Sequence, residues 1–262
     1  MQRVVAASST DLSAMNGPST EVPKASRRAV ILWRIALLAW IALTVWPVTY
    51  RSTRAAQIIL FIGILVGALA LWRKRWLAFT VLTLAVLLLA LGLWPGRNAD
   101  SERLRNRYLH ELTSYIDVRY VWGGENRVGI DCSGLVRRAW IHTLWKEGVF
   151  TANPGLIREA ANLWWNDASA RALASQHRQQ TRFVAQVEAL TPSNTSPLLS
   201  GDLAVTVDGI HVLAYLGSNK WIEADPDLGH VVLLPTATPS DDSNVWLKVP
   251  VRVVRWTLLD GP

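Results

Sequence analysis

The chain has 262 residues, half of them hydrophobic, and a formal net charge of +7. This length allows one domain of ordinary size with additional elements. Residues 1–97 contain 11 Lys and Arg against 2 Asp and Glu, whereas residues 98–262 contain 16 against 18. A nucleic-acid-binding protein would carry a basic surface on its folded domain, so the distribution argues against a nucleic-acid partner.

Residues 1–28 are rich in Ser and Ala and contain few large apolar side chains. This composition predicts a disordered tail. We expect no cleavable signal peptide, because the apolar run that follows is too long for a signal sequence.

Three apolar runs follow, at about residues 29–50, 55–72 and 76–95. Each approaches or reaches the roughly 20 residues that a helix needs to cross a bilayer. The alternative, buried helices of a soluble domain, would require three such runs to be hidden within one small protein. Tryptophans stand near the run ends, as membrane interfaces favour: Trp33, Trp46, Trp72, Trp76 and Trp94. The pattern predicts a three-helix anchor that spans a lipid bilayer.

Basic residues near the run ends predict the orientation of this anchor. Six lie on one side if all three runs span: Lys24, Arg27, Arg28, Arg73, Lys74 and Arg75. The other side has Arg51, Arg54 and Arg97 close to the run ends. The bias predicts a cytoplasmic N-terminus and a C-terminal domain, residues 98–262, outside the cytoplasm.

Residues 100–116 predict an amphipathic helix, since Leu104, Tyr108, Leu112 and Ile116 recur every four residues. The next stretch is YVWGGENRVGIDCSGLVRRAW. Its paired glycines interrupt an extended aromatic segment. A second helical pattern begins directly after Asp131, which is a suitable N-cap residue.

Cys132 is the one cysteine of the chain, so no intramolecular disulfide can form. In the first turn of a helix, a thiol faces unpaired backbone N–H groups and the positive end of the helix dipole. Both favour the thiolate, which is the nucleophilic form. The glycines before it allow a substrate backbone to approach closely. Helix capping alone would also explain Asp131.

A thiolate nucleophile needs a base or ion-pair partner, usually His. His211 and His230 each follow a Gly-containing turn and begin an apolar run. We favour His211, because GDLAVTVDG followed by HVLAYLG predicts strand, turn and strand. In the returning segment WIEAD, Glu223 and Asp225 share one strand face. An odd-numbered hairpin loop would place that face with His211, and a two-residue loop would not.

A carboxylate on the His211 face could orient the imidazole and stabilise its cation. Either Glu223 or Asp225 could serve, and a solvated strand residue is the alternative for Glu223.

These segments together resemble the NlpC family of papain-like cell-wall cysteine peptidases. The resemblance rests on YVWGG, DCSGLV, LLSGDLAV, HVLAYLG and WIEA in that order, over about residues 103–235. It implies that Cys132 is the nucleophile, His211 the base and Glu223 the third catalytic residue. It also implies that Asp131 and Ser133 bind the free amino end of a short peptide, and that Tyr120 and Trp122 line the cleft.

Two features depart from the family pattern. The third catalytic position is more often His, Asn or Gln than Glu. Residues 150–200 form a long segment between Cys132 and His211, and its composition predicts added helices over or beside the cleft. Because of this segment, the resemblance identifies the chemistry of the site more firmly than the substrate.

The expected fold class is α+β, with the Cys132 helix packed on a small antiparallel sheet and the three-helix anchor in front. Strands are predicted at 202–207, 211–216, 220–224, 229–234 and 245–256. No cofactor and no metal are expected, because Cys132 and His211 have no partners at ligand spacing.

The expected function is hydrolysis of peptidoglycan stem peptides, between D-glutamate and the diamino acid, at the outer face of a bacterial cytoplasmic membrane. One alternative is a thiol amidase or an acyltransferase that acts on a lipid or another conjugate. Another is a non-catalytic, membrane-tethered binding module, although such a module would have no chemical reason to keep both Cys132 and His211. The sequence leaves the oligomeric state and any protein partners open.

Overall fold

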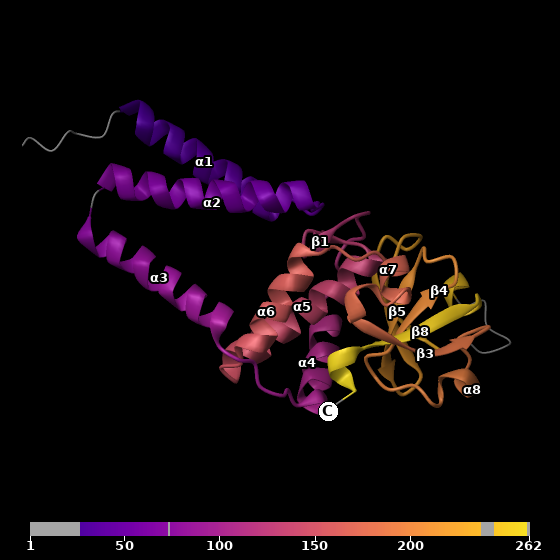
Figure 1. Ribbon diagram of the computed structural model, residues 1–262. Coiled ribbons are helices and arrows are strands. Elements are labelled where there is room, and N and C mark those ends of the chain that lie inside the picture. The colour runs from indigo at the N-terminus through magenta and orange to yellow at the C-terminus, as the bar shows by residue number, and fades with distance from the viewer. Residues whose placement is uncertain (1–26, 73, 237–243, 261–262) are drawn as a thin grey trace, which may run out of the picture.

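The computed structural model describes residues 27–72, 74–236 and 244–260. It begins with three helices: α1 (Arg27–Val45), α2 (Arg51–Trp72) and α3 (Arg75–Leu93). All three are long and apolar enough to cross a membrane. In α1 and α3 no side chain is buried by the protein, so their apolar surfaces are available to lipid. Figure 1 shows α1 and α2 side by side as a hairpin, with α3 diverging from them.

The three predicted apolar helices are therefore present, close to the expected bounds. Most of the predicted tail, residues 1–26, lies outside the described residues, and Arg27 and Arg28 belong to α1.

The remaining helices belong to the C-terminal domain. They are α4 (Ser101–Thr113), α5 (Cys132–Phe150), α6 (Pro154–Trp165) and the short α7 (Ala170–Ala174) and α8 (Pro192–Thr195). The central one is α5, which buries side chains on most of its circumference. Trp140 of α5 meets the edge of Tyr108 from α4, with ring centroids 5.2 Å apart, and stacks on Trp256 at 5.5 Å. These rings join the helices to the sheet.

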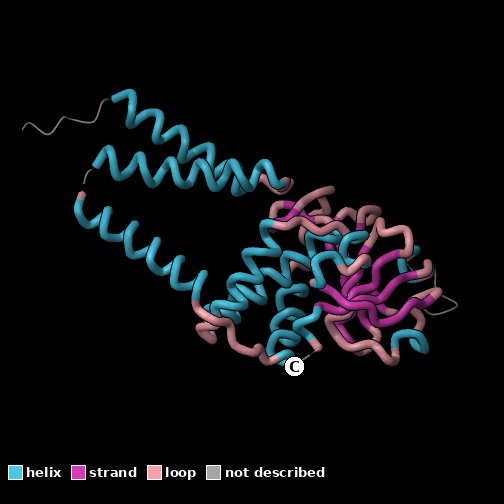
Figure 2. The backbone as a smooth tube through the Cα atoms, viewed as in Figure 1, coloured by secondary structure: helices cyan, strands magenta, loops and turns pink. Residues whose placement is uncertain are grey.

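The sheet has six antiparallel strands in the order β3-β8-β4-β5-β6-β7. Their bounds are β3 (Thr181–Val187), β4 (Leu203–Thr206), β5 (Val212–Gly217), β6 (Lys220–Asp225), β7 (His230–Pro235) and β8 (Val251–Trp256). One face packs on α5 and its neighbouring helices, and the other packs on Leu190, Leu198 and Leu247. Figure 2 shows the long helices of this domain on one side of the strands and the short α8 on the other. The predicted α+β class, with the Cys132 helix on an antiparallel sheet, is confirmed.

Two details of the prediction are wrong. Residues 150–200 contain α6 and α7, as expected, but also β3, which pairs with β8 at the sheet edge. As an edge strand, β3 is largely exposed, so it lacks a buried apolar pattern. The predicted strand 245–256 is shorter, because Val245–Leu247 forms a 3-10 turn and Pro250 precedes β8. Proline cannot donate to a strand ladder.

The glycines of the WGG and DCSG segments allow the backbone of the loop before β1 to pack directly against the backbone of the first turn of α5. A Cβ atom on Gly134, in the first turn of α5, would lie 2.2 Å from the carbonyl oxygen of Gly124. Gly124 itself precedes a small hairpin of β1 (Glu125–Asn126) and β2 (Gly129–Ile130). The start of α5 is therefore fixed against this hairpin by direct backbone packing.

Gly134→Ala should lower the free energy of unfolding by about 1–3 kcal/mol, the usual cost of overpacking. Within an unobstructed helix the same change is stabilising, so the clash with Gly124 reverses the expected sign. The measurement is the thermal midpoint of the full chain in detergent. Gly92→Ala in α3 is the control, because no atom lies within 4 Å of its added Cβ. Equal midpoints for Gly134→Ala and wild type would contradict the packing argument.

Candidate active site

Cys132 is the first residue of α5 and is 6% exposed. The residue before it, Asp131, is the N-cap. One oxygen of its carboxylate accepts hydrogen bonds from the Gly134 N–H at 2.6 Å and the Ser133 hydroxyl at 3.0 Å, and the other accepts from the Gly123 N–H at 2.9 Å. Asp131 therefore fixes both the first turn of α5 and the glycine loop beside the thiol.

His211 lies at the start of β5 and is 2% exposed. Its imidazole interacts with Cys132 and with Glu223, and its Nε2 is hydrogen-bonded to the Glu223 carboxylate. The Trp246 ring stacks on the imidazole, with centroids 4.3 Å apart and planes 19° from parallel. The side chain is thus held in one orientation, with the thiol and a carboxylate as its polar neighbours.

A β-bulge brings Glu223 to the face of His211. The hairpin between β5 and β6 has the two-residue turn Ser218–Asn219, both with positive φ. Such a turn alone would place Glu223 on the opposite face. However, Gly217 pairs with Lys220 while Tyr215 pairs with Trp221, so Leu216 is an extra residue in β5. The extra residue reverses the side-chain alternation, and Glu223 then meets His211.

The structure shows which of the two candidate carboxylates, Glu223 or Asp225, contacts the imidazole. Glu223 contacts it directly, and Asp225 is linked through Asn244, whose amide donates to Glu223 Oε1 at 2.5 Å and to Asp225 Oδ2 at 2.6 Å. Asn244 and Trp246 were not predicted from the sequence. Trp246 lies in the predicted strand 245–256 and Asn244 directly precedes it, and the one local signal was an Asn able to cap the turn at Val245–Leu247.

The surroundings favour the imidazolium form of His211. Burial would lower the pKa of His211, but its interactions with Cys132 and Glu223 raise it to about 9. Burial raises the pKa of Glu223, although its hydrogen bond to His211 acts in the opposite sense. At neutral pH the imidazole is therefore cationic and placed between two potential anions.

A cavity of about 440 Å³ opens at Cys132. It is lined by residues of the glycine loop, the start of α5, the α6–α7 connection, the turn before His211 and the loop between α1 and α2: Thr49, Tyr50, Tyr120, Trp122, Gly123, Glu125, Asp131, Cys132, Ser133, Asp167, Ser169, Ala170, Arg171, Gly209 and Ile210. The residues predicted to bind substrate (Tyr120, Trp122, Asp131 and Ser133) all face this cavity. Trp122 is 74% exposed. Burial raises the pKa of Tyr120 above its usual value.

The other histidines near the domain core have different partners. His142 lies near Glu111 and Tyr115, and burial lowers its pKa to about 4. His230 contacts the carbonyl of Leu228 at the start of β7. Among the described residues, no cluster of three or more His, Cys, Asp or Glu could hold a metal ion.

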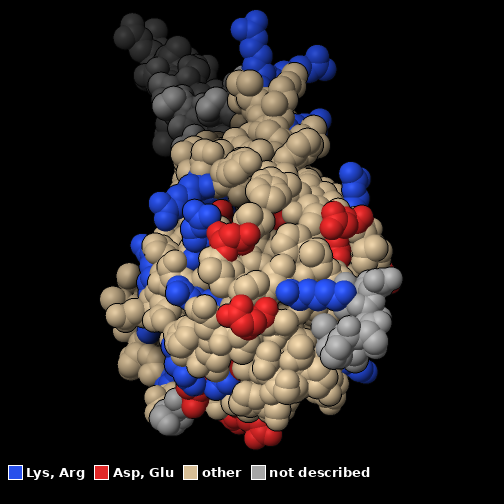
Figure 3. All heavy atoms as spheres, turned by 90° about the vertical axis from the view of Figure 1, so that its right-hand side faces the viewer, with Lys and Arg blue, Asp and Glu red and all other residues tan. Residues whose placement is uncertain are grey.

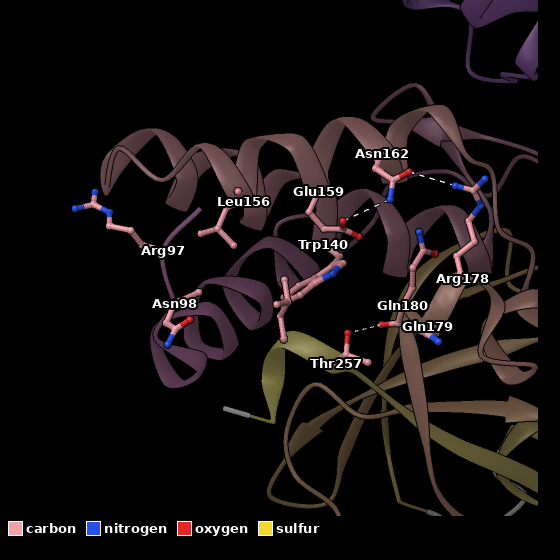
Figure 4. A pocket seen from close by; sticks show the side chains of 13 residues that line it. Arg97, Asn98, Trp140, Leu156, Glu159, Asn162, Arg178, Gln179, Gln180 and Thr257 are labelled. Atoms are coloured by element: carbon pink, nitrogen blue, oxygen red, sulfur yellow. Dashed lines mark hydrogen bonds between the residues drawn. The ribbon is translucent and has the colours of Figure 1, made fainter. Parts of the chain in front are cut away.

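A second cavity, of about 520 Å³, lies between α5, α6 and the segment 178–180. Figure 4 shows Glu159 and Asn162 of α6 on one side and Arg178 and Gln180 on the other. Its lining lacks Cys132, which faces the first cavity. On the domain surface away from the helices, acidic and basic side chains are interspersed (Figure 3), and that face has no continuous basic patch.

No family model matches the chain, and no curated protein matches it. Among solved structures it is similar to the peptidoglycan hydrolase RipB of Mycobacterium tuberculosis, with 20% identity over 63% of this chain and 70% of that chain and a TM-score of 0.37. It is also similar to the P60 domain of an antigen of Mycobacterium avium subspecies paratuberculosis (19% identity, 59% and 96% covered, TM-score 0.35).

A third similar structure is NlpC1 of Trichomonas vaginalis (16% identity, 63% and 48% covered, TM-score 0.38). The P60 and NlpC names are those of the family that the sequence motifs resemble.

Glu223→Gln should lower the pKa of His211 from about 9, because it removes an interaction that raises this pKa. A group whose pKa is raised stays protonated up to that pKa, so the variant should lose the imidazolium at lower pH. The measurement is the imidazole NMR titration of histidine-labelled protein in detergent. Asp227→Asn, an exposed carboxylate two residues beyond Asp225, is the control and should leave the titration unchanged. A wild-type midpoint near the ordinary value of about 6.5 would refute the arrangement.

Proposed function

We propose that the chain is a membrane-anchored cysteine peptidase. The observation that carries this proposal is the chain of contacts from Cys132, which lines a cavity at the start of α5, to His211 directly before β5 and on to Glu223 in β6. A thiol at a helix N-terminus, beside an imidazole that is itself held by a carboxylate, is the arrangement that nucleophilic catalysis by cysteine requires.

The geometry supports a two-step hydrolysis. The Cys132 thiolate attacks the peptide carbonyl carbon, a C–S bond forms, and the carbonyl oxygen takes the negative charge. The backbone N–H groups of Cys132 and Ser133, which precede the Gly134 N–H bound to Asp131, then stabilise this oxyanion. His211 donates its proton to the leaving amine as the C–N bond breaks.

Water then hydrolyses the thioester. His211 accepts a proton from the attacking water, and the C–S bond breaks to regenerate the thiolate. Glu223 stabilises the imidazolium in both steps, and Asn244 and Trp246 hold the pair in place. Glu223 thus takes the third catalytic position, where the family more often has His, Asn or Gln.

The proposed substrate is the stem peptide of peptidoglycan, cleaved between D-glutamate and the diamino acid. The motif resemblance supports this choice, and the cavity lining is compatible with it. All four residues line the cavity, and we assign Asp131 and Ser133 to the amino end of the peptide and Tyr120 and Trp122 to the walls of the cleft. The Asp131 carboxylate already accepts three hydrogen bonds, which pre-orders it for a cationic group.

The proposed orientation has the N-terminus in the cytoplasm and the catalytic domain outside a bacterial cytoplasmic membrane. Each arginine on the domain side has a structural partner. Arg54 pairs with Glu125, Arg51 donates to Asn166, and Arg97 donates to the carbonyls of Thr151 and Ala152. Domain contacts therefore account for these cations. On the opposite side, Arg27, Arg28, Lys74 and Arg75 supply the bias expected of a cytoplasmic face.

The full chain in lipid nanodiscs should release new stem-peptide fragments from purified peptidoglycan, and Cys132→Ala should release none. Mass spectrometry of the fragments identifies the bond. Ser193→Ala, at a site in α8 outside the cavity lining, is the control for handling. If folded wild type releases nothing, peptide hydrolysis is refuted. A lipid-derived acyl group found on Cys132 would then favour acyl transfer.

Alkaline phosphatase fused after Pro262 should be active in cells, and the same reporter inserted at Lys74 should be inactive, because the enzyme works only outside the cytoplasm. A green fluorescent protein fused at each point should give the opposite pattern. An inactive phosphatase at Pro262, with bright fluorescence there, would place the domain in the cytoplasm and exclude a wall substrate.

A further inference from the structure

We propose that the loop between α1 and α2, residues 46–50, forms one wall of the substrate cleft, with Tyr50 as a substrate-binding residue. The membrane anchor is then a component of the active site and does more than tether it. This inference rests on the proposed peptidase function, because it assigns residues to the binding of the same peptide.

The loop is joined to the catalytic domain by backbone hydrogen bonds. The Glu125 N–H donates to the Pro47 carbonyl at 2.9 Å, and the Asn126 amide donates to the carbonyls of Val45 and Trp46 at 3.1 and 3.0 Å. Val48 also forms an antiparallel bridge with Gly124. In Figure 1 the end of the α1–α2 hairpin lies beside β1. The loop therefore packs on the β1–β2 hairpin and Gly124, which also contact the start of α5 beside Cys132.

A buried ion cluster holds this contact together. Arg54, the fourth residue of α2, is fully buried and donates to Glu125 Oε2 at 2.5 Å. Arg137 of α5 pairs with the other oxygen of the same carboxylate. Thr49 donates to Glu125 at 3.0 Å. Burial would raise the pKa of Glu125, but the two arginines outweigh it and lower the pKa, so the carboxylate stays ionised between anchor and domain.

The position of the loop makes it part of the cleft. Thr49 and Tyr50 line the same cavity as Cys132, Tyr120 and Trp122. The Thr49 hydroxyl is engaged by Glu125, whereas the Tyr50 side chain is 60% exposed. An exposed aromatic ring at the rim of a reactive cavity offers a peptide a flat apolar surface and a hydroxyl.

The location also sets where the substrate is bound. Tyr50 immediately precedes α2, and Trp46 immediately follows α1. The cleft therefore opens at the ends of the membrane helices, at the level of the bilayer surface. Arg158 of α6 also donates to the carbonyls of Leu91 and Trp94 at the end of α3. This second contact between the apolar helices and the domain holds the domain at the same level.

The test is steady-state cleavage of a synthetic stem peptide by the full chain in nanodiscs. Tyr50→Ala should raise KM about tenfold and leave kcat within about twofold, because the lost contact is made equally in the bound and transition states. Tyr50→Phe should restore most of the affinity if the ring supplies the contact. Trp46→Ala is the matched control, since Trp46 is an exposed aromatic of the same loop, 63% exposed, that does not line the cavity.

The outcomes separate the two proposals. If folded wild type cleaves no peptide, the peptidase function fails and the inference fails with it. If wild type cleaves and Tyr50→Ala has an unchanged KM, the function stands and the cleft-wall role is refuted. An equal rise in KM for Trp46→Ala would also refute it, because a general disturbance of the loop would then explain both variants.

Discussion

One residue, Glu125, joins the apolar helix α2, the glycine hairpin and the central helix α5. It receives Arg54 from α2 and Arg137 from α5, and its own N–H binds the loop between α1 and α2. Removing one partner of a buried ion pair typically costs about 3–5 kcal/mol, because the remaining charge is left without compensation. Glu125 stands two residues after Gly123, which binds Asp131 beside the nucleophile. The position of the thiol and the docking of the anchor therefore depend on the same group.

The sequence was sufficient for features that leave a local pattern. Three apolar runs, the first containing the single Arg34, predicted α1, α2 and α3, and Asp131 before a helical pattern predicted the start of α5. The strand pair around His211 followed from turn residues between apolar segments. The structure places Cys132, His211 and Glu223 at one site, as the motif order implied. Their catalytic roles remain proposals.

Features that depend on pairing between distant segments could not be predicted. The bulge at Leu216 changes the face of Glu223, yet a bulge is defined by a partner strand and leaves no periodic signal. Asn244 contacts Glu223 and Trp246 stacks on His211, from the start of a segment that was predicted to be a strand from residue 245 onward. In the sequence, Arg54 was one of the basic residues that predicted the orientation of the apolar helices. Its burial against Glu125 in the structure shows that it also forms an ion pair with the C-terminal domain. The edge strand β3 was missed because its side chains are largely exposed.

The contact between the α1–α2 loop and Glu125 also affects the order in which the protein is assembled during synthesis. The hairpin is made first, and its loop presents Arg54 without a counter-ion until Glu125 has been synthesised and has arrived on the same side of the bilayer. A catalytic domain retained on the opposite side could fold around Cys132 but would lack Thr49 and Tyr50 at its cleft. In the proposed orientation, assembly of the complete cavity therefore requires that the domain cross the bilayer, and a domain that stays on the other side lacks two of the residues that line the cavity.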